Sequence, residues 1–139
     1  MDNKKLIEYA LSARNYSYSP YSKYRVGAAV LCSDGSVFTG ANIENATYGA
    51  TVCAERTAVF SALMGGHKDI VSIAVCGGSE SETDNLSDYA YPCGICRQVL
   101  REFANPEELN VIVARSCEDY REYKLEELLP NSFGPDHLN

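Results

Sequence analysis

Basic residues are scarce in this sequence, which has 12 lysines and arginines against 19 aspartates and glutamates and a net charge of −7. Proteins that bind nucleic acids or anionic membrane surfaces need clustered positive charge, so this balance argues against both partners. Long apolar runs are also missing: no segment could cross a bilayer, and the N-terminus lacks the apolar stretch of a signal peptide. We therefore expect a cytoplasmic protein with no nucleic-acid partner and no membrane partner.

Internal repeats, low-complexity tracts and linkers are absent as well. The 139 residues fit one domain, residues 1–139, and a hydrophobic fraction of 45% suits a core that needs no disulfide. Because cytoplasmic thiols stay reduced, the 6 cysteines are better explained as metal ligands or core residues. The two histidines, His67 and His137, adjoin no motif, and no function is assigned to them.

Hydrophobic patterning predicts the order of helices and strands. The spacing of Leu6, Ile7, Ala10 and Leu11 is that of an amphipathic helix. Apolar runs and turn signals predict strands over residues 26–32, 37–41, 70–76, 111–114 and 120–124, the first two joined as a hairpin. Further helices are expected over residues 53–64, 93–103 and 125–129, and an acidic loop over residues 77–90.

This order predicts an α/β fold, namely a three-layer sandwich with a mixed, about five-stranded sheet and helices on both faces. The two central helices, 53–64 and 93–103, are expected to be right-handed crossovers between neighbouring strands. Both would then begin at the same edge of the sheet, where α/β proteins commonly place their sites.

Two short fragments, Cys53-Ala54-Glu55 and Pro92-Cys93-Gly94-Ile95-Cys96, each stand at the start of a predicted helix. Cys93 and Cys96 are three apart, so their sulfurs face the same way across one turn, and Cys53 opens the facing helix. Three converging thiolates leave the fourth tetrahedral position of a zinc ion open to water, as a catalytic rather than a structural site requires. We therefore predict that Cys53, Cys93 and Cys96 bind one Zn²⁺ per chain.

Glu55 lies two residues after a ligand, close to the metal but too constrained to bind it. It can therefore move protons between water and a substrate. Three thiolates weaken zinc as a Lewis acid, but the positive helix N-termini and hydrogen bonds from Arg56 would offset this effect. The bound water then becomes a nucleophile near neutral pH.

The two fragments resemble the zinc-dependent nucleoside and nucleobase deaminases. Cys53 stands where some branches of this group use histidine. A cysteine at this position resembles the small homotetrameric cytidine deaminases. The likeness extends to residues 18–28, to Asn42-Ile43-Glu44-Asn45 and to Leu128-Leu129-Pro130, in the order and spacing of that family. It implies a cytidine deaminase-like fold and hydrolytic deamination of free cytidine and 2′-deoxycytidine in pyrimidine salvage. Zinc-activated water would attack C4 of cytosine, Glu55 would shuttle protons, and ammonia would leave.

The resemblance also implies contacts with the substrate. Asn42 and Glu44 would bind the sugar 3′-hydroxyl, so that ribose and deoxyribose are both accepted. Tyr24 would stack on the base, at a position where family members usually carry phenylalanine. The backbone of Ala54 would read the base edge, and the carbonyl of Tyr91 would accept a hydrogen bond from the leaving ammonia.

Three further residues, Ala46, Tyr48 and Phe133, resemble residues that reach into a neighbouring subunit's site. They imply a homotetramer whose sites are shared between subunits. Without the resemblance, the aromatic residues would be assigned to core or interface packing. Asn42 and Glu44 could equally be residues that cap a loop.

The cysteine motifs also fit proteins of different function. Cys32, Cys76 or Cys117 could complete a four-ligand structural zinc site in a non-enzymatic module, although these three fit small buried core residues better. Cys93-x-x-Cys96 alone could be a redox pair. Deaminases of cytosine-containing antibiotics of the blasticidin S type share the zinc motifs but lack the Asn-x-Glu signature. Enzymes that edit cytosine in polynucleotides need basic and aromatic strand-binding surfaces, which this chain lacks.

Overall fold

The computed structural model describes residues 1–138, and its centre is a five-stranded sheet in the order β2-β1-β3-β4-β5. The strands are β1 (Tyr24–Cys32), β2 (Val37–Ala41), β3 (Ile70–Ser79), β4 (Asn110–Ser116) and β5 (Asp119–Lys124). The β3–β4 pair is parallel and the other three pairs are antiparallel, so the sheet is mixed, as predicted.

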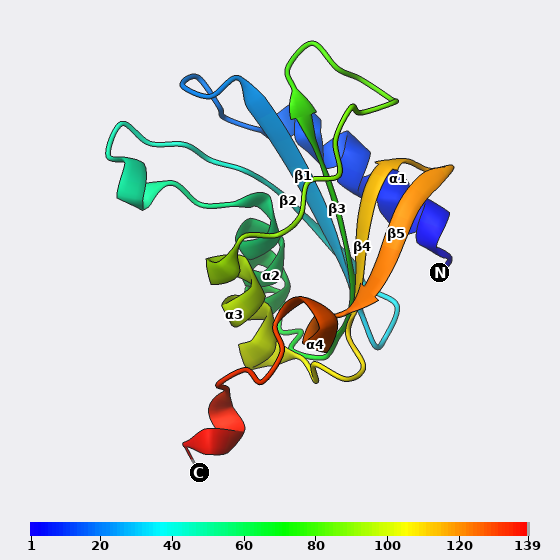
Figure 1. Ribbon diagram of the computed structural model, residues 1–139, viewed down its shortest axis with the longest axis vertical. Coiled ribbons are helices and arrows are strands. Elements are labelled where there is room, and N and C mark those ends of the chain that lie inside the picture. Colours follow the sequence, from blue (N-terminus) through cyan, green and yellow to red (C-terminus); the bar gives the residue numbers. More distant parts are fainter. Residues whose placement is uncertain (139) are drawn as a thin grey trace.

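Helices cover both faces of this sheet (Figure 1). They are α1 (Asn3–Ala13), α2 (Ala54–Met64), α3 (Gly94–Phe103) and α4 (Leu125–Leu128), with short 3₁₀ turns η1 (Arg14–Tyr16), η2 (Tyr48–Ala50) and η3 (Pro135–His137). Alternate residues of the strands pack against α1 on one face and against α2 and α3 on the other, forming two apolar clusters. The predicted three-layer α/β sandwich is thus confirmed. Within residues 1–138, every helix is too short or too polar to span a membrane.

Two details of the predicted topology were wrong. Helix α3 connects the adjacent strands β3 and β4, but α2 connects β2 to β3, and β1 lies between those two strands. The acidic loop also begins later than expected, because β3 continues through Gly77 and Gly78 to Ser79. These residues pair with the first residues of β1, which itself begins at Tyr24. Two glycines and a serine favour a turn locally, and strand pairing overrides that preference.

The start of α2 is fixed by close contact with β2 at Gly40. A Cβ atom on Gly40 would lie 2.3 Å from the backbone nitrogen of Ala58 and 2.7 Å from the carbonyl oxygen of Ala54. Only glycine therefore lets the helix backbone approach the strand so closely. This contact sets the position of Ala54 and of the residues on either side of it.

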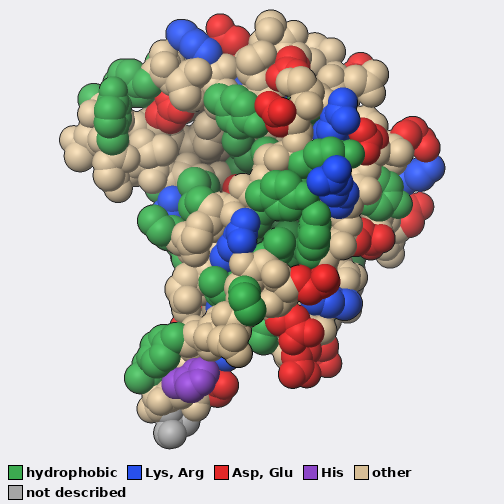
Figure 2. Space-filling model, viewed as in Figure 1, with side chains coloured by type: hydrophobic (Ala, Val, Ile, Leu, Met, Phe, Trp, Pro, Cys, Tyr) green, Lys and Arg blue, Asp and Glu red, His purple; other side chains and the backbone are tan. Residues whose placement is uncertain are grey.

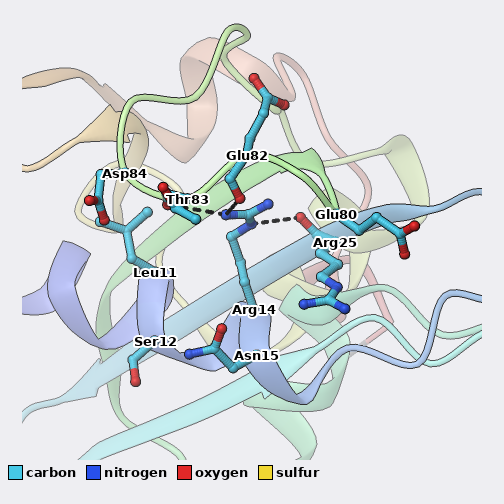
Figure 3. A pocket seen from close by; sticks show the side chains of 9 residues that line it. All are labelled: Leu11, Ser12, Arg14, Asn15, Arg25, Glu80, Glu82, Thr83 and Asp84. Carbon is cyan, nitrogen blue, oxygen red and sulfur yellow. Dashed lines mark hydrogen bonds between the residues drawn. The ribbon is translucent and has the colours of Figure 1, made fainter.

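Arg14 forms a second anchor, on the α1 face. Its buried guanidinium donates hydrogen bonds to the carbonyl oxygens of Arg25 (3.0 Å), Gly78 (3.2 Å), Ser79 (3.1 Å) and Glu82 (3.2 Å), as Figure 3 shows in part. We call this arrangement the Arg14 clamp. It fastens the loop after β3 to the beginning of β1.

Candidate active site

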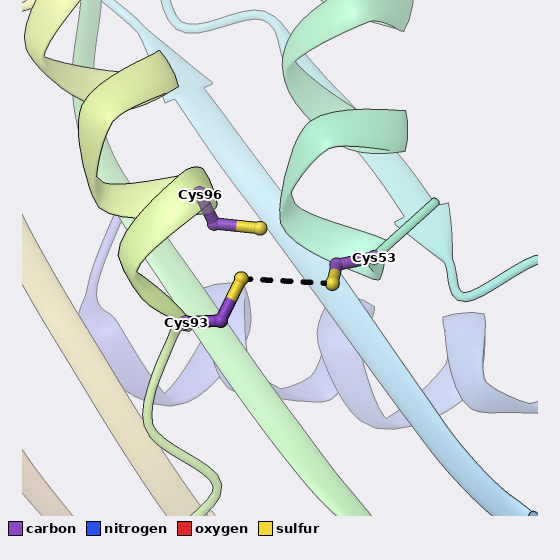
Figure 4. A group of neighbouring side chains, drawn as sticks. All are labelled: Cys53, Cys93 and Cys96. Atoms are coloured by element: carbon purple, nitrogen blue, oxygen red, sulfur yellow. Dashed lines mark hydrogen bonds between the residues drawn. The ribbon is translucent and has the colours of Figure 1, made fainter. Parts of the chain in front are cut away.

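Helices α2 and α3 begin side by side, and each begins with a cysteine. Cys53 is the N-cap residue of α2, Cys93 is the N-cap residue of α3, and both have extended backbone conformations. Cys96 lies in the first turn of α3 and is fully buried. The three sulfur atoms lie within 4.8 Å of one another, and the Cys53 and Cys93 sulfurs are 3.8 Å apart (Figure 4). The structure thus brings the three predicted ligands together.

The geometry of this cluster fits zinc. A tetrahedral zinc ion with Zn–S bonds of about 2.3 Å separates its sulfur ligands by about 3.8 Å, the distance between Cys53 and Cys93. Within residues 1–138, this is the only group of three or more metal-ligating side chains close enough to hold an ion. Cys32 and Cys76 are buried in β1 and β3, away from the cluster. The donor set therefore has three sulfurs and an open fourth position.

The surroundings favour negative charge on the Cys53 sulfur. Hydrogen bonding with Cys96, and then with Arg56 and Cys93, lowers the pKa of Cys53 to about 5. The Nη2 atom of Arg56 lies 3.5 Å from the Cys53 sulfur. The first turns of α2 and α3 add the positive ends of two helix dipoles. Thiolate, the form that binds a metal, is thus the favoured state of Cys53, whereas the hydrogen bond with Cys53 and burial raise the pKa of Cys96.

Glu55 lies in the first turn of α2, beside these sulfurs. Only 5% of it is exposed. Burial, and then the negative charge of Cys53, raises the pKa of its carboxyl group to about 7. A carboxyl group of this kind can both accept and donate a proton near neutral pH.

A cavity of about 300 Å³ opens in front of Glu55 and the cysteines. This volume lies within the range of sites for small molecules. Three of the predicted substrate-binding residues, Tyr24, Asn42 and Ala54, line it. Val26, Thr51, Ala90 and Tyr91 complete the wall with Cys53, Cys93 and Glu55.

Asn42 and Glu44 are held by hydrogen bonds to their own surroundings. Oδ1 of Asn42 accepts from the backbone nitrogen of Val26 (2.9 Å) and its Nδ2 donates to the Tyr24 carbonyl (2.9 Å). The Glu44 carboxylate accepts from the backbone nitrogens of residues 21 and 22 and from the Ser22 hydroxyl. Both side chains therefore hold neighbouring loop backbone in place, and each also lines a hollow.

Glu44 and Tyr48 line a hollow that adjoins the cavity and shares Thr51 with it. Ala46 and Phe133 line neither space. Tyr48 is 76% exposed and Phe133 is 58% exposed. They lie in the loop between β2 and α2 and in the C-terminal segment, which both extend away from the sandwich (Figure 1). Within a single chain these residues are separate from the cysteine cluster.

The side chain of Tyr91 and its partners on β5 were not predicted from the sequence. The Tyr91 hydroxyl lies 2.6 Å from the Tyr123 hydroxyl and accepts a hydrogen bond from Arg121 (3.2 Å). Arg121 also stacks on the Tyr89 ring, 4.0 Å from its centre. Figure 2 shows hydrophobic side chains and Lys or Arg side chains side by side on this face. Arg121 and Tyr123 are two residues apart in β5 and therefore lie on one face of the sheet, which was the one sequence signal for such a contact.

Comparison with known proteins decides the family. The model of a family described as "Cytidine and deoxycytidylate deaminase zinc-binding region" matches residues 1–113. The chain belongs to the cytidine deaminase family. The cytidine deaminase of Halalkalibacterium halodurans is 45% identical over 139 residues, which cover 100% of this chain and 99% of that protein. The cytidine deaminase of Mycobacterium tuberculosis H37Rv is 39% identical over 129 residues, covering 93% and 87%.

Solved structures give the same family. The crystal structure of the cytidine deaminase from Burkholderia pseudomallei matches this fold with a TM-score of 0.85 and 43% identity, covering 96% of this chain and 100% of that one. A cytidine deaminase structure from Mycobacterium tuberculosis matches with a TM-score of 0.81 and 36% identity, covering 96% and 98%. The family model describes a zinc-binding region, and the cluster of Cys53, Cys93 and Cys96 is a site that can hold zinc. Zinc is therefore the cofactor of this member of the cytidine deaminase family.

Proposed function

We propose that this member of the cytidine deaminase family hydrolyses free cytidine and 2′-deoxycytidine to uridine and 2′-deoxyuridine, with release of ammonia. The observation that carries the proposal is the buried Glu55 carboxyl group beside three clustered cysteines at the wall of a small-molecule cavity. The substrates named for its relatives support the same class. We assign the reaction to pyrimidine salvage in the cytoplasm, where six free cysteines stay reduced.

The chemistry divides between the metal and Glu55. Zinc held by the three sulfurs would lower the pKa of a water molecule at the open position toward neutrality. Glu55 takes a proton from water and gives it to N3 of the cytosine ring as the oxygen adds to C4. Glu55 then takes the proton of the new C4 hydroxyl and gives it to the amino group, so that ammonia leaves as the C4–N bond breaks and the C4 carbonyl of uridine forms. Arg56 draws charge from the Cys53 sulfur throughout.

Tyr24, Ala54, Asn42 and Glu44 orient the nucleoside in this proposal. The Tyr24 ring faces the base, and the Ala54 backbone reads its edge. Nδ2 of Asn42 keeps one hydrogen beyond the bond to the Tyr24 carbonyl. The Glu44 carboxylate has about four acceptor positions, of which three are in use. One donor and one acceptor are therefore left for the sugar 3′-hydroxyl.

We further propose a homotetramer in which Ala46, Tyr48 and Phe133 complete the site of a neighbouring subunit. Their exposure on two extended segments supports this role. The outward face of α2 supports assembly as well. It carries Thr57, Phe60, Ser61 and Met64, which with Ile43 and Val52 line a shallow hollow of about 430 Å³. Apolar side chains on the outer face of a helix mark a surface that another protein surface covers.

Light scattering after gel filtration should give a mass four times that of the 15.2 kDa chain. Replacing Phe60 and Met64 with glutamate should lower this mass and the activity together, because it puts charge into an apolar contact. Tyr9→Glu is the matched control, since Tyr9 is similarly exposed but lies on α1 at the opposite face of the sheet. A wild-type mass of one chain would refute the assembly.

The activity itself is tested with purified, zinc-loaded protein and three substrates: cytidine, deoxycytidine and blasticidin S. We expect the ultraviolet absorbance of both nucleosides to fall as the amino group is lost, with kcat in the ordinary enzyme range of roughly 1–1,000 per second. Blasticidin S should be unchanged. Turnover of blasticidin S alone would show that Asn42 and Glu44 do not bind a sugar, and turnover of none would refute the enzyme assignment.

A further inference from the structure

We propose that Gly77 is a positioning residue. Because it has no side chain, it leaves room for the Tyr24 ring, which lies over it and forms the rear wall of the substrate cavity. This inference rests on the proposed function, because it concerns how the cavity holds a nucleoside. Gly77 is buried in β3 and pairs with Val26 of β1. It does not line the cavity, but Val26, Tyr24 and Ala90, which surround it, do.

The space at Gly77 is filled by its neighbours from two directions. A Cβ atom there would lie 2.7 Å from Cβ of Ala90, 3.0 Å from Cε2 of Tyr24 and 3.1 Å from the Tyr24 hydroxyl. Carbon atoms in favourable contact are about 3.5–4.0 Å apart, so one methyl group would displace Ala90, Tyr24 or both. Both of these residues line the cavity.

Backbone conformation does not require a glycine at this position. Only Gly35 and Gly66 among the glycines have positive φ angles. Glycine inside a strand costs free energy relative to alanine, and it commonly marks the close approach of another group. The group that approaches here is the Tyr24 side chain, including its hydroxyl. Gly77 therefore lowers the stability of the strand but leaves room for the Tyr24 ring.

Gly77→Ala tests this role because its backbone is allowed and its one added methyl group points at the cavity wall. We expect KM for cytidine to rise at least about tenfold, since a small displacement of a positioning group has large effects. Zinc content and kcat should stay within about twofold of wild type, because the cysteines and Glu55 lie on other elements. A purely structural role would instead lower the amount of folded protein and leave KM unchanged.

Two comparison variants sharpen the experiment. Val71→Ala is the control, because Val71 is exposed on the same strand β3 and does not line the cavity. The double variant Gly77→Ala with Ala90→Gly removes the 2.7 Å contact and keeps the contacts with Tyr24. Its KM should fall between those of wild type and Gly77→Ala. If Gly77→Ala does not fold, the double variant is tested in its place. Its KM for cytidine should still be about threefold higher than that of the wild-type protein.

A crystal structure of Gly77→Ala gives a second measurement that needs no turnover. We expect the Tyr24 ring or Ala90 to be displaced into the cavity. A KM within twofold of wild type, or a crystal structure with both residues in place, would overturn the inference. If the wild-type protein does not deaminate cytidine, the proposed function fails, and the displacement of Tyr24 in the crystal still decides whether Gly77 positions it.

Discussion

Replacing Glu55 with glutamine should lower kcat for cytidine by at least about a thousandfold while the protein keeps one zinc ion per chain. Glutamine has nearly the same size as glutamate, so the packing of this buried position at the start of α2 is preserved. It can neither accept a proton from water nor donate one to N3 of cytosine. Absorbance assays measure the loss of turnover, and elemental analysis measures the zinc.

Glu102→Gln provides the matched control for Glu55→Gln. Glu102 is exposed on α3, so the same loss of one carboxylate there should leave both turnover and zinc unchanged. A Glu55→Gln protein with turnover within tenfold of wild type would show that another group moves the protons. Loss of zinc together with activity would show that Glu55 supports the metal site instead.

Replacing Cys93 with alanine should remove zinc and with it all measurable turnover. Cys93 is the exposed member of the cluster, so the substitution leaves no cavity in the core, whereas Cys96 is fully buried. Two sulfurs cannot hold zinc as three do, and we expect the affinity to fall by more than about a hundredfold. Titration with a competing chelator measures this change, and thermal unfolding shows whether the fold survives.

The control for Cys93→Ala is Cys117→Ala. Cys117 lies between β4 and β5, where its thiol contacts the Lys4 carbonyl, and it is no part of the cluster. The Cys117→Ala protein should bind zinc as wild type does. If it also lost zinc, a fourth cysteine would belong to the site, and the assignment of the open position to catalysis would fail.

The sequence was sufficient to predict the layers of the fold and the meeting of the cysteines. The three central strands β1, β3 and β4 contain apolar runs, and such runs leave little choice of structure. The two fragments that contain Cys53 and Cys93 each begin a helix, and helices that begin at one sheet edge bring their first turns together. Local patterning and topology agree here, which is why the prediction succeeded.

Long-range contacts account for what the sequence could not reveal. The apolar periodicity of α2 says that the helix packs on the sheet, but not that it passes over β1 on the way from β2 to β3. Gly77 and Gly78 belong to a strand only because β1 pairs with them. Arg14 would be assigned to the surface from its charge alone, since lone buried arginines are rare. Its partners are backbone carbonyls, which have no sequence signature.

The Arg14 clamp has a consequence for how the protein opens. Arg14 follows directly after α1, whereas the Gly78 carbonyl that it holds is 64 residues away in the chain. The loop after β3 therefore loses its anchor whenever α1 detaches from the sheet. Gly77 precedes that anchored carbonyl directly and lies behind the Tyr24 ring. We therefore expect detachment of the N-terminal helix, on the face of the sheet opposite the cysteines, to loosen the rear wall of the cavity as well.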